Sequence, residues 1–156
     1  MKKLLVAFSI LTFFISCSND SGLQRIPEQI DYSAENEKEI TEYLTKNNLT
    51  AVKTGTGLHY IITEEGTGKK PTLESNITVT YKGSLTNGTV FDQSTTNVTF
   101  PLKRLIAGWQ EALPLFKEGG SGILYIPAHL GYGGDKVQNI PAGSVLIFEI
   151  KLITVN

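Results

Sequence analysis

The segment ITVTYKGSLTNGT, residues 77–89, decides the fold class. Its first half alternates apolar residues with threonines, so that Ile77, Val79 and Tyr81 share one face of an extended strand. Its second half contains the dipeptide Asn-Gly, which suits the positive φ angles of a type I′ turn. The segment therefore predicts a strand that leads into a tight antiparallel hairpin.

Period-two patterns recur along the chain after residue 56. Residues 58–62, 123–126 and 145–155 are further β-prone runs. In the longest run the even-numbered apolar residues share one face, whereas Glu149 and Lys151 share the other. One short helical stretch, residues 108–113, interrupts these strands, and Pro114 limits its continuation. Strands with one helix to cover one face predict the α+β class with an antiparallel sheet.

A separate amphipathic helix is predicted at residues 34–46, within a helical extension that spans residues 34–56. Either Asp31 or Ser33 offers a side-chain oxygen that can accept a free backbone N–H at the start of this helix. Its narrow apolar stripe consists of Ile40, Tyr43 and Leu44. This pattern predicts a docking or spacer helix. Because it is too short for a dimerising stalk of several heptads, we expect a monomer.

The first 17 residues have the pattern of an export signal. Two lysines precede residues 4–15, a run in which only Ser9 and Thr12 are polar. About a dozen such residues are short for a membrane span, which needs roughly 20, and suit a signal peptide. Residues 14–17, Phe-Ile-Ser-Cys, are similar to a bacterial lipobox, in which the thiol of the cysteine is acylated.

We therefore expect a lipoprotein signal peptide at residues 1–16, lipidation of Cys17, and a polar tether over residues 17–33. An acylated N-terminus without a second membrane segment predicts a protein anchored to a bilayer of the bacterial cell envelope. The residues after Cys17 show no obvious inner-membrane retention signal, which favours the outer membrane, facing the periplasm. Two alternatives are a short uncleaved anchor and an ordinary secretory signal with an incidental cysteine.

Charge and composition exclude several kinds of function. The net charge is −1, and removal of residues 1–16 takes away two lysines and no acidic residue, giving −3. Binding to nucleic acid requires a basic face, so it is excluded. A metal site needs three or four convergent ligands, whereas the two histidines, His59 and His129, lie in different segments without cysteine partners. We expect neither a metal nor a cofactor.

Aromatic residues gather beside the turns and the ends of the predicted elements. They are Tyr81, Phe91, Phe100, Trp109, Tyr132 and Phe148. Core packing explains any one of them taken alone. Their surroundings, however, form six motifs that occur in a fixed order. These are VTYKG (79–83), NGTVFDQS (87–94), FPL (100–102), LIAGWQEAL (105–113), IPAHLGYG (126–133) and IPAGSVLIFE (140–149).

In these motifs the chain from about residue 57 to residue 155 resembles the FKBP family of prolyl isomerases. The resemblance implies an isomerase domain over residues 57–156, in which a twisted antiparallel sheet wraps around the short helix at Trp109. It places a ligand pocket between sheet and helix. It assigns catalysis to Phe91, Asp92, Trp109, Tyr132 and Phe148, and substrate binding to Tyr81, Phe100, Leu105, Ile106 and Ile140.

The resemblance further implies that the backbone N–H of Ile106 and the hydroxyl of Tyr132 bind carbonyl groups of the ligand. An alternative for Asp92 is a turn residue that caps its own backbone. The implied activity is peptidyl-prolyl cis-trans isomerisation of proline-containing exported polypeptides, without a cofactor, and macrolide inhibitors of the family are possible further ligands.

Other interpretations remain: a binding module or chaperone of the envelope with little catalysis, and a lipoprotein whose domain is only a spacer. Inactive relatives typically lose pocket residues, whereas this sequence retains nearly all of them, which favours the enzyme.

Overall fold

The computed structural model describes residues 30–156. The predicted signal peptide, Cys17 and most of the predicted tether lie outside these residues. The helices and strands are α1 (Ser33–Lys46), β1 (Val52–Lys53), β2 (His59–Glu64), β3 (Asn76–Leu85), β4 (Val90–Pro101), α2 (Ala107–Ala112), β5 (Ser121–Ile126) and β6 (Leu146–Val155). Three 3-10 turns join them: η1 (Leu102–Arg104), η2 (Leu113–Leu115) and η3 (Ala128–Leu130).

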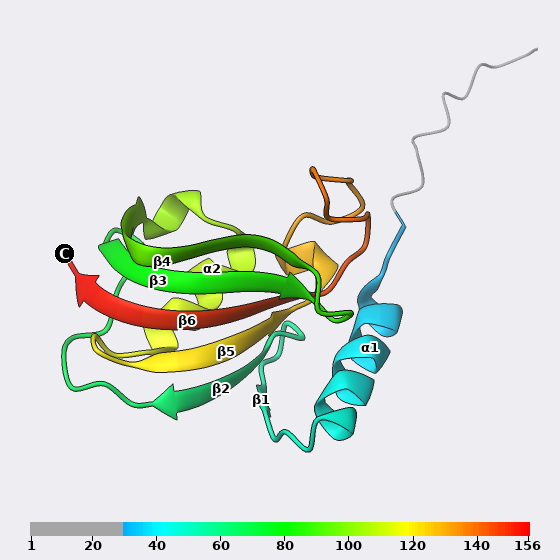
Figure 1. Ribbon diagram of the computed structural model, residues 1–156, viewed down its shortest axis with the longest axis horizontal. Coiled ribbons are helices and arrows are strands. Elements are labelled where there is room, and N and C mark those ends of the chain that lie inside the picture. Colours follow the sequence, from blue (N-terminus) through cyan, green and yellow to red (C-terminus); the bar gives the residue numbers. More distant parts are fainter. Residues whose placement is uncertain (1–29) are drawn as a thin grey trace, which may run out of the picture.

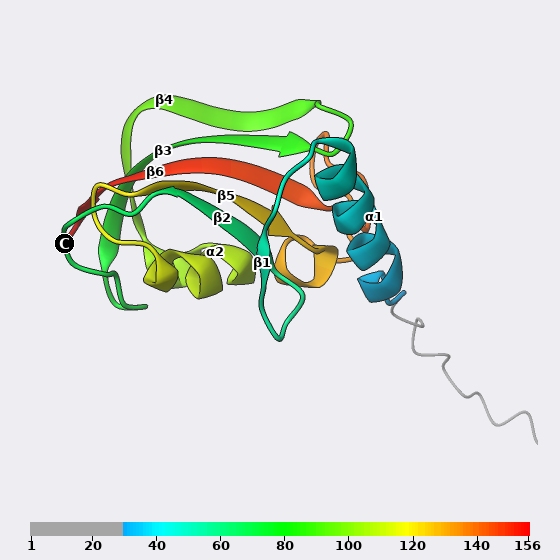
Figure 2. The same ribbon diagram turned by 90° about the horizontal axis from the view of Figure 1, so that it is seen from below.

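The strands form one six-stranded sheet in the order β1-β2-β5-β6-β3-β4 (Figure 1). Every neighbouring pair is antiparallel. Figure 2 shows α2 against one face of the curved sheet and α1 across one end of it. The predicted α+β class, an antiparallel sheet with one short helix on its face and a helix at the N-terminal side, is confirmed.

The hairpin between β3 and β4 is confirmed, but the predicted type I′ turn is wrong. Of the two central residues only Gly88 has a positive φ, +87°. The N–H of Gly88 donates to the carbonyl of Leu85, whose own N–H donates to the carbonyl of Thr89. The loop therefore has three residues and ends on a left-handed glycine, a common alternative to the two-residue turn. The side chain of Asn87 accepts the N–H of Thr89 at 2.9 Å, so it supports the loop without a positive φ of its own.

The main core lies between the sheet and α2. The even-numbered residues of β6 from Leu146 to Leu152 are buried in it, whereas Glu149 and Lys151 are exposed, as the alternation predicted. Gly108 of α2 allows the helix to approach β5 closely, because a Cβ at this position would lie 2.5 Å from the side chain of Ile126. This close approach sets the depth of the space between helix and sheet.

A second, smaller core lies beneath α1. Ile40 and Leu44 pack against a cluster that contains Tyr125, Val145 and Ile147, and Tyr43 is half-buried beside them. The predicted apolar stripe of the helix is thus confirmed. The helix begins one residue earlier than predicted, and Asp31 is the residue that accepts a free N–H, that of Ser33 at 2.9 Å. The hydrogen bonds from Ser33 lower the pKa of Asp31.

Two local features differ from the sequence prediction. The helix predicted at residues 108–113 is α2, Ala107–Ala112, followed by the 3-10 turn η2, which contains Pro114. The change of helix type at this point agrees with the missing N–H of proline. The two-residue strand β1 was not predicted, because a strand of this length leaves no hydrophobic period in the sequence. Among residues 30–156 no helix has the length and apolarity needed to cross a bilayer.

Candidate active site

A pocket of about 180 Å³ opens between the sheet and α2. Its lining residues are Tyr81, Phe91, Asp92, Phe100, Leu105, Ile106, Trp109, Tyr132 and Phe148. Nine of the ten residues that the family resemblance nominated therefore surround one space. The tenth, Ile140, is buried and lines an adjoining hollow of about 190 Å³, which shares Phe91, Asp92 and Tyr132 with the pocket.

Residues far apart in the sequence meet here because the sheet order brings β3 between β4 and β6. Tyr81 lies on β3, and Phe91, Asp92 and Phe100 lie on β4. Leu105 and Ile106 lie between η1 and α2, Trp109 on α2, Tyr132 just after η3, and Phe148 on β6. Only the folded topology, and no local sequence spacing, can assemble such a set.

The aromatic rings are fixed by edge-to-face contacts. The Trp109 and Phe148 ring centroids lie 5.2 Å apart at 90°, and those of Tyr81 and Trp109 lie 5.5 Å apart at 86°. Phe91 meets Phe148 at 5.5 Å and 83°. Such pairs contribute about 0.5–1.5 kcal/mol each beyond burial of apolar area. The pocket is therefore an apolar box in which neighbouring rings hold one another in place.

Gly83 is a requirement of this box that the sequence pattern did not single out. It lies on β3, opposite Asp92 of β4 and Phe148 of β6. A Cβ at this position would lie 2.6 Å from the ring of Phe91 and 2.9 Å from that of Phe148. Gly83 therefore allows both rings to close over the strand.

The polar part of the pocket centres on Asp92. Its Oδ2 accepts a hydrogen bond from the hydroxyl of Tyr81 at 2.6 Å. Asp92 lies within β4, and its carboxylate accepts a hydrogen bond from Tyr81 instead of capping its own backbone. Burial and then this hydrogen bond raise the pKa of Tyr81 to about 12. Burial and then the negative charge of Asp92 also raise the pKa of Tyr132. Both hydroxyls therefore stay protonated at neutral pH and can donate.

Two donors at the rim are free to bind a ligand. Within residues 30–156 neither the N–H of Ile106 nor the hydroxyl of Tyr132 has a hydrogen-bond partner. The indole N–H of Trp109 is buried and likewise has no partner in this part of the chain. Gln110, which the sequence analysis did not nominate, donates from its Nε2 to the carbonyl of Leu105 at 2.6 Å. This bond fixes the backbone next to the N–H of Ile106.

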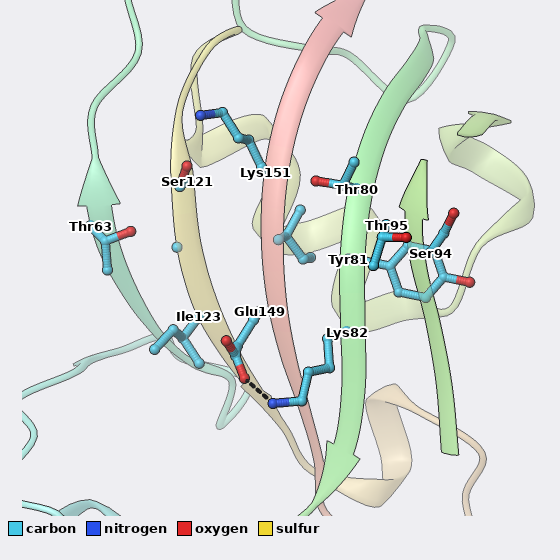
Figure 3. A pocket seen from close by; sticks show the side chains of 12 residues that line it. Thr63, Thr80, Tyr81, Lys82, Ser94, Thr95, Ser121, Ile123, Glu149 and Lys151 are labelled. Atoms are coloured by element: carbon cyan, nitrogen blue, oxygen red, sulfur yellow. Dashed lines mark hydrogen bonds and ion pairs between the residues drawn. The ribbon is translucent and has the colours of Figure 1, made fainter. Parts of the chain in front are cut away.

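A larger hollow, about 510 Å³, lies on the opposite face of the sheet (Figure 3). Its lining is mostly threonine, serine and charged residues. Lys82 and Glu149 form an ion pair across β3 and β6 at 2.9 Å, and both side chains are about half exposed. The lining of this hollow is that of a solvated sheet surface. Size alone therefore does not identify the site, and its chemistry favours the smaller aromatic pocket.

The two histidines serve local structure. His59 is buried, and its Nδ1 lies 3.2 Å from the carbonyl oxygen of Gly57. The Nε2 of His129 lies 2.9 Å from the carbonyl oxygen of Thr56. Over the range that the structure describes, no group of three His, Cys, Asp or Glu side chains is arranged to hold a metal ion.

Comparison with known families and proteins finds a matching family and several similar proteins. Residues 67–153 match the family described as FKBP-type peptidyl-prolyl cis-trans isomerase. A probable isomerase of this type, FkpA of Neisseria meningitidis, is 44% identical over 128 residues, which cover 76% of this chain and 46% of the relative. The isomerase Mip of Coxiella burnetii is 43% identical over 126 residues, covering 77% and 55%. The chain spans about half the length of these curated relatives.

Solved structures show the same fold. FkpA from Escherichia coli superimposes with a TM-score of 0.71 at 36% identity, covering 80% of this chain and 61% of that one. A peptidyl-prolyl isomerase from Pseudomonas syringae superimposes with a TM-score of 0.70 at 31% identity, covering 81% and 97%.

Proposed function

Because the chain belongs to the family of FKBP-type peptidyl-prolyl cis-trans isomerases, we propose that it catalyses rotation about X-Pro bonds of exported polypeptides. The observation that carries this proposal is the convergence of nine pocket residues, with two unpaired donors at the rim. The geometry suits a proline ring in an apolar box with its flanking carbonyl groups at the edge.

Rotation about an X-Pro bond crosses a barrier of about 18–20 kcal/mol because amide resonance is lost as the bond twists. At the upper end this barrier corresponds to about 0.01 events per second. To reach about 100 per second, the protein must lower the barrier by roughly 5 kcal/mol. Positioning and a change of environment are sufficient for an effect of this size, since no covalent bond is broken.

The pocket can supply this stabilisation through its dryness. Resonance places partial negative charge on the carbonyl oxygen and partial positive charge on nitrogen, and twisting removes that polarity. A water-poor aromatic site therefore binds the twisted bond better than the planar, hydrated bond. Trp109 and Phe148 hold the proline ring by apolar contact, and burial of the ring contributes a few kcal/mol, at about 25 cal/mol per Å².

The polar groups orient the substrate chain. The N–H of Ile106 and the hydroxyl of Tyr132 donate to carbonyl groups on either side of the proline. Asp92, held by Tyr81, lies beside the bond that twists. These few polar contacts set direction, while the rings provide most of the binding.

The test is the cis-to-trans rate of a short X-Pro peptide with the purified chain, beside Trp109→Ala and Asp92→Ala. We expect acceleration far above the uncatalysed rate, and a loss of at least about tenfold in kcat/KM in each variant. A folded chain that gives no acceleration would refute catalysis. Binding of a proline peptide without acceleration would leave a binding module of the envelope.

The proposal extends to the location of the protein. The lipobox-like residues 14–17 support acylation of Cys17 and an anchor in the bacterial envelope, with the domain facing the periplasm from the outer membrane. A radiolabelled fatty acid should be incorporated into the chain in growing cells and not into Cys17→Ser, and the label should fractionate with outer membrane. Incorporation that persists in Cys17→Ser would contradict the anchor. If the protein is a monomer, as proposed, light scattering should give the mass of one chain.

A further inference from the structure

The N-terminal helix α1 contacts the loop that carries Tyr132. Figures 1 and 2 both show the start of α1 beside the loop between β5 and β6. This loop, residues 127–145, begins with η3, carries Tyr132 at the rim of the pocket, and continues through Ile140 of the adjoining hollow. Contacts of α1 with this loop can therefore influence the position of Tyr132 at the pocket.

Asn36 is the polar centre of this contact. It is 2% exposed, although it lies on a helix whose other polar side chains are mostly in solvent. Its Oδ1 accepts the N–H of Ala128 at 2.7 Å, and its Nδ2 donates to the carbonyl of Gly143 at 2.8 Å. One partner is a donor and the other an acceptor, so the orientation of the amide is fixed. A single side chain thus joins the two ends of the loop.

Backbone hydrogen bonds carry this constraint to Tyr132. The carbonyl of Ala128 also accepts the N–H of Gly133 at 2.7 Å, and the N–H of Gly143 donates to the carbonyl of Gly133 at 2.9 Å. Tyr132 is the residue directly before Gly133, and 36% of its surface is exposed. The two loop ends that Asn36 joins are therefore hydrogen-bonded to Gly133, the residue next to Tyr132.

A second contact from the same end of α1 supports the junction of the two loop ends. The ring of Tyr32 lies so close to Gly143 that a Cβ there would overlap it, and Gly143 has a φ of +73°. A side chain at this position is therefore excluded both by space and by backbone conformation. Tyr32 and Asn36, one helical turn apart, enclose Gly143 between them.

We propose that Asn36 is a positioning residue that holds the Tyr132 hydroxyl at the rim of the pocket. This inference rests on the proposed function for its effect on rate. Asn36 is not among the residues that line the pocket and acts through the bonds at Ala128, Gly133 and Gly143. The helix outside the isomerase motifs then contributes to catalysis as well as to spacing.

The decisive variant is Asn36→Asp. It keeps the size of the side chain and can still accept the N–H of Ala128, but its second oxygen faces the carbonyl of Gly143 without a hydrogen to donate. We expect kcat/KM to fall about three- to tenfold, and no further than in Tyr132→Phe. The matched control is Leu44→Ala on the same helix, which removes apolar packing in the smaller core and leaves both hydrogen bonds of Asn36 in place. It should lower thermal stability and leave kcat/KM of the folded protein unchanged.

A double-mutant cycle separates positioning from a general loss of stability. If Asn36 acts through the Tyr132 hydroxyl, the double variant Asn36→Asp with Tyr132→Phe should be no slower than Tyr132→Phe alone. Leu44→Ala combined with Tyr132→Phe should likewise match Tyr132→Phe. Additive losses from Asn36→Asp and Tyr132→Phe would overturn the proposal, as would equal effects of Asn36→Asp and Leu44→Ala on kcat/KM.

Hydrogen exchange distinguishes this proposal from the proposed function. Asn36→Asp should speed exchange at the amides of Gly133 and Gly143, and Leu44→Ala should not. If the unaltered chain proves inactive, the proposed function fails, while exchange still decides whether Asn36 holds the loop. Unchanged exchange at both glycines would overturn the positioning role, whatever the activity.

Discussion

The two faces of the sheet each carry a hollow, and the two hollows differ in volume and in the chemistry of their linings. The inner hollow, about 180 Å³, is lined by interlocked aromatic rings and one carboxylate. The outer hollow is nearly three times as large, about 510 Å³, and is lined by short polar side chains and one ion pair. Binding a proline requires apolar walls that exclude water, and only the inner hollow has them. Shape and chemistry, more than volume, separate a site from a surface depression.

One residue, Tyr81, lines both hollows. Its ring packs in the inner aromatic cluster, while its strand passes beneath the outer hollow. The two regions are therefore separated by a single layer of strands. This thin partition makes neighbouring residues on one strand suitable as matched probes of the two faces.

The largest difference is expected between Phe148→Ala and Ile147→Ala. These adjacent residues of β6 are 5% and 4% exposed but face opposite sides of the sheet. Truncation should lower the free energy of unfolding by about 3–5 kcal/mol for Phe148 and about 2–5 kcal/mol for Ile147. Only Phe148→Ala should abolish isomerase activity per folded molecule, because only Phe148 lines the pocket.

The measurement combines denaturant unfolding with the peptide isomerisation rate, at a temperature where both variants are folded. Equal residual activity in the two variants would break the distinction between the faces. It would mean that stability of β6, and not the aromatic lining, governs the rate.

A smaller effect is expected from the outer hollow. Lys82→Ala and Glu149→Ala each remove one partner of the exposed ion pair, which should change stability by about 0–1 kcal/mol. We expect kcat/KM to stay within about twofold of the unaltered chain, since neither side chain touches the inner pocket. A large loss of activity in either variant would show that the outer face also binds substrate, and peptide titration of the variants would locate it.

The smallest effect concerns ionisation of Tyr81. Its folded-state pKa is about 12 against an ordinary value of 10, so the unfolded chain loses this proton first as the pH rises. The contribution of Tyr81 to the free energy of unfolding is therefore fully present below pH 10 and is lost between pH 10 and 12. Tyrosinate absorbance, compared with that of Tyr81→Phe, should show this titration moving to lower pH in Asp92→Asn. It should remain above the ordinary value because burial, the largest cause, persists. No movement in Asp92→Asn would mean that the hydrogen bond is absent.

Periodic patterns made most of the fold predictable. Alternation placed the even-numbered residues of β6 in the core, and the spacing of Ile40, Tyr43 and Leu44 marked the buried stripe of α1. The turn type was mispredicted because Asn-Gly fits both a two-residue loop and a three-residue loop that ends on glycine. Which loop forms depends on the register of β3 against β4, and this register is a property of the paired strands.

The residues of the site were likewise predictable only in part. The family motifs nominated the lining residues, and the structure places nine of these ten around one pocket. Gly83, Gln110 and Asn36 were not nominated because their importance comes from what lies across from them. Gly83 matters because of two rings on neighbouring strands, and Asn36 because of two backbone groups more than 90 residues away. Such relations leave no periodicity in the sequence.

The position of β6 has a consequence for how the chain acquires its fold. This strand lies inside the sheet between β5 and β3, and its pairing joins Ile77 to Val155. The sheet is therefore incomplete until residues 146–155 are present. Before that point the hairpin of β3 and β4 lacks its pairing with β6. Topologies dominated by such distant contacts fold slowly, in milliseconds to seconds. Slow folding of this kind suits the proposed export, because a chain that has not yet folded can cross a membrane in the unfolded state.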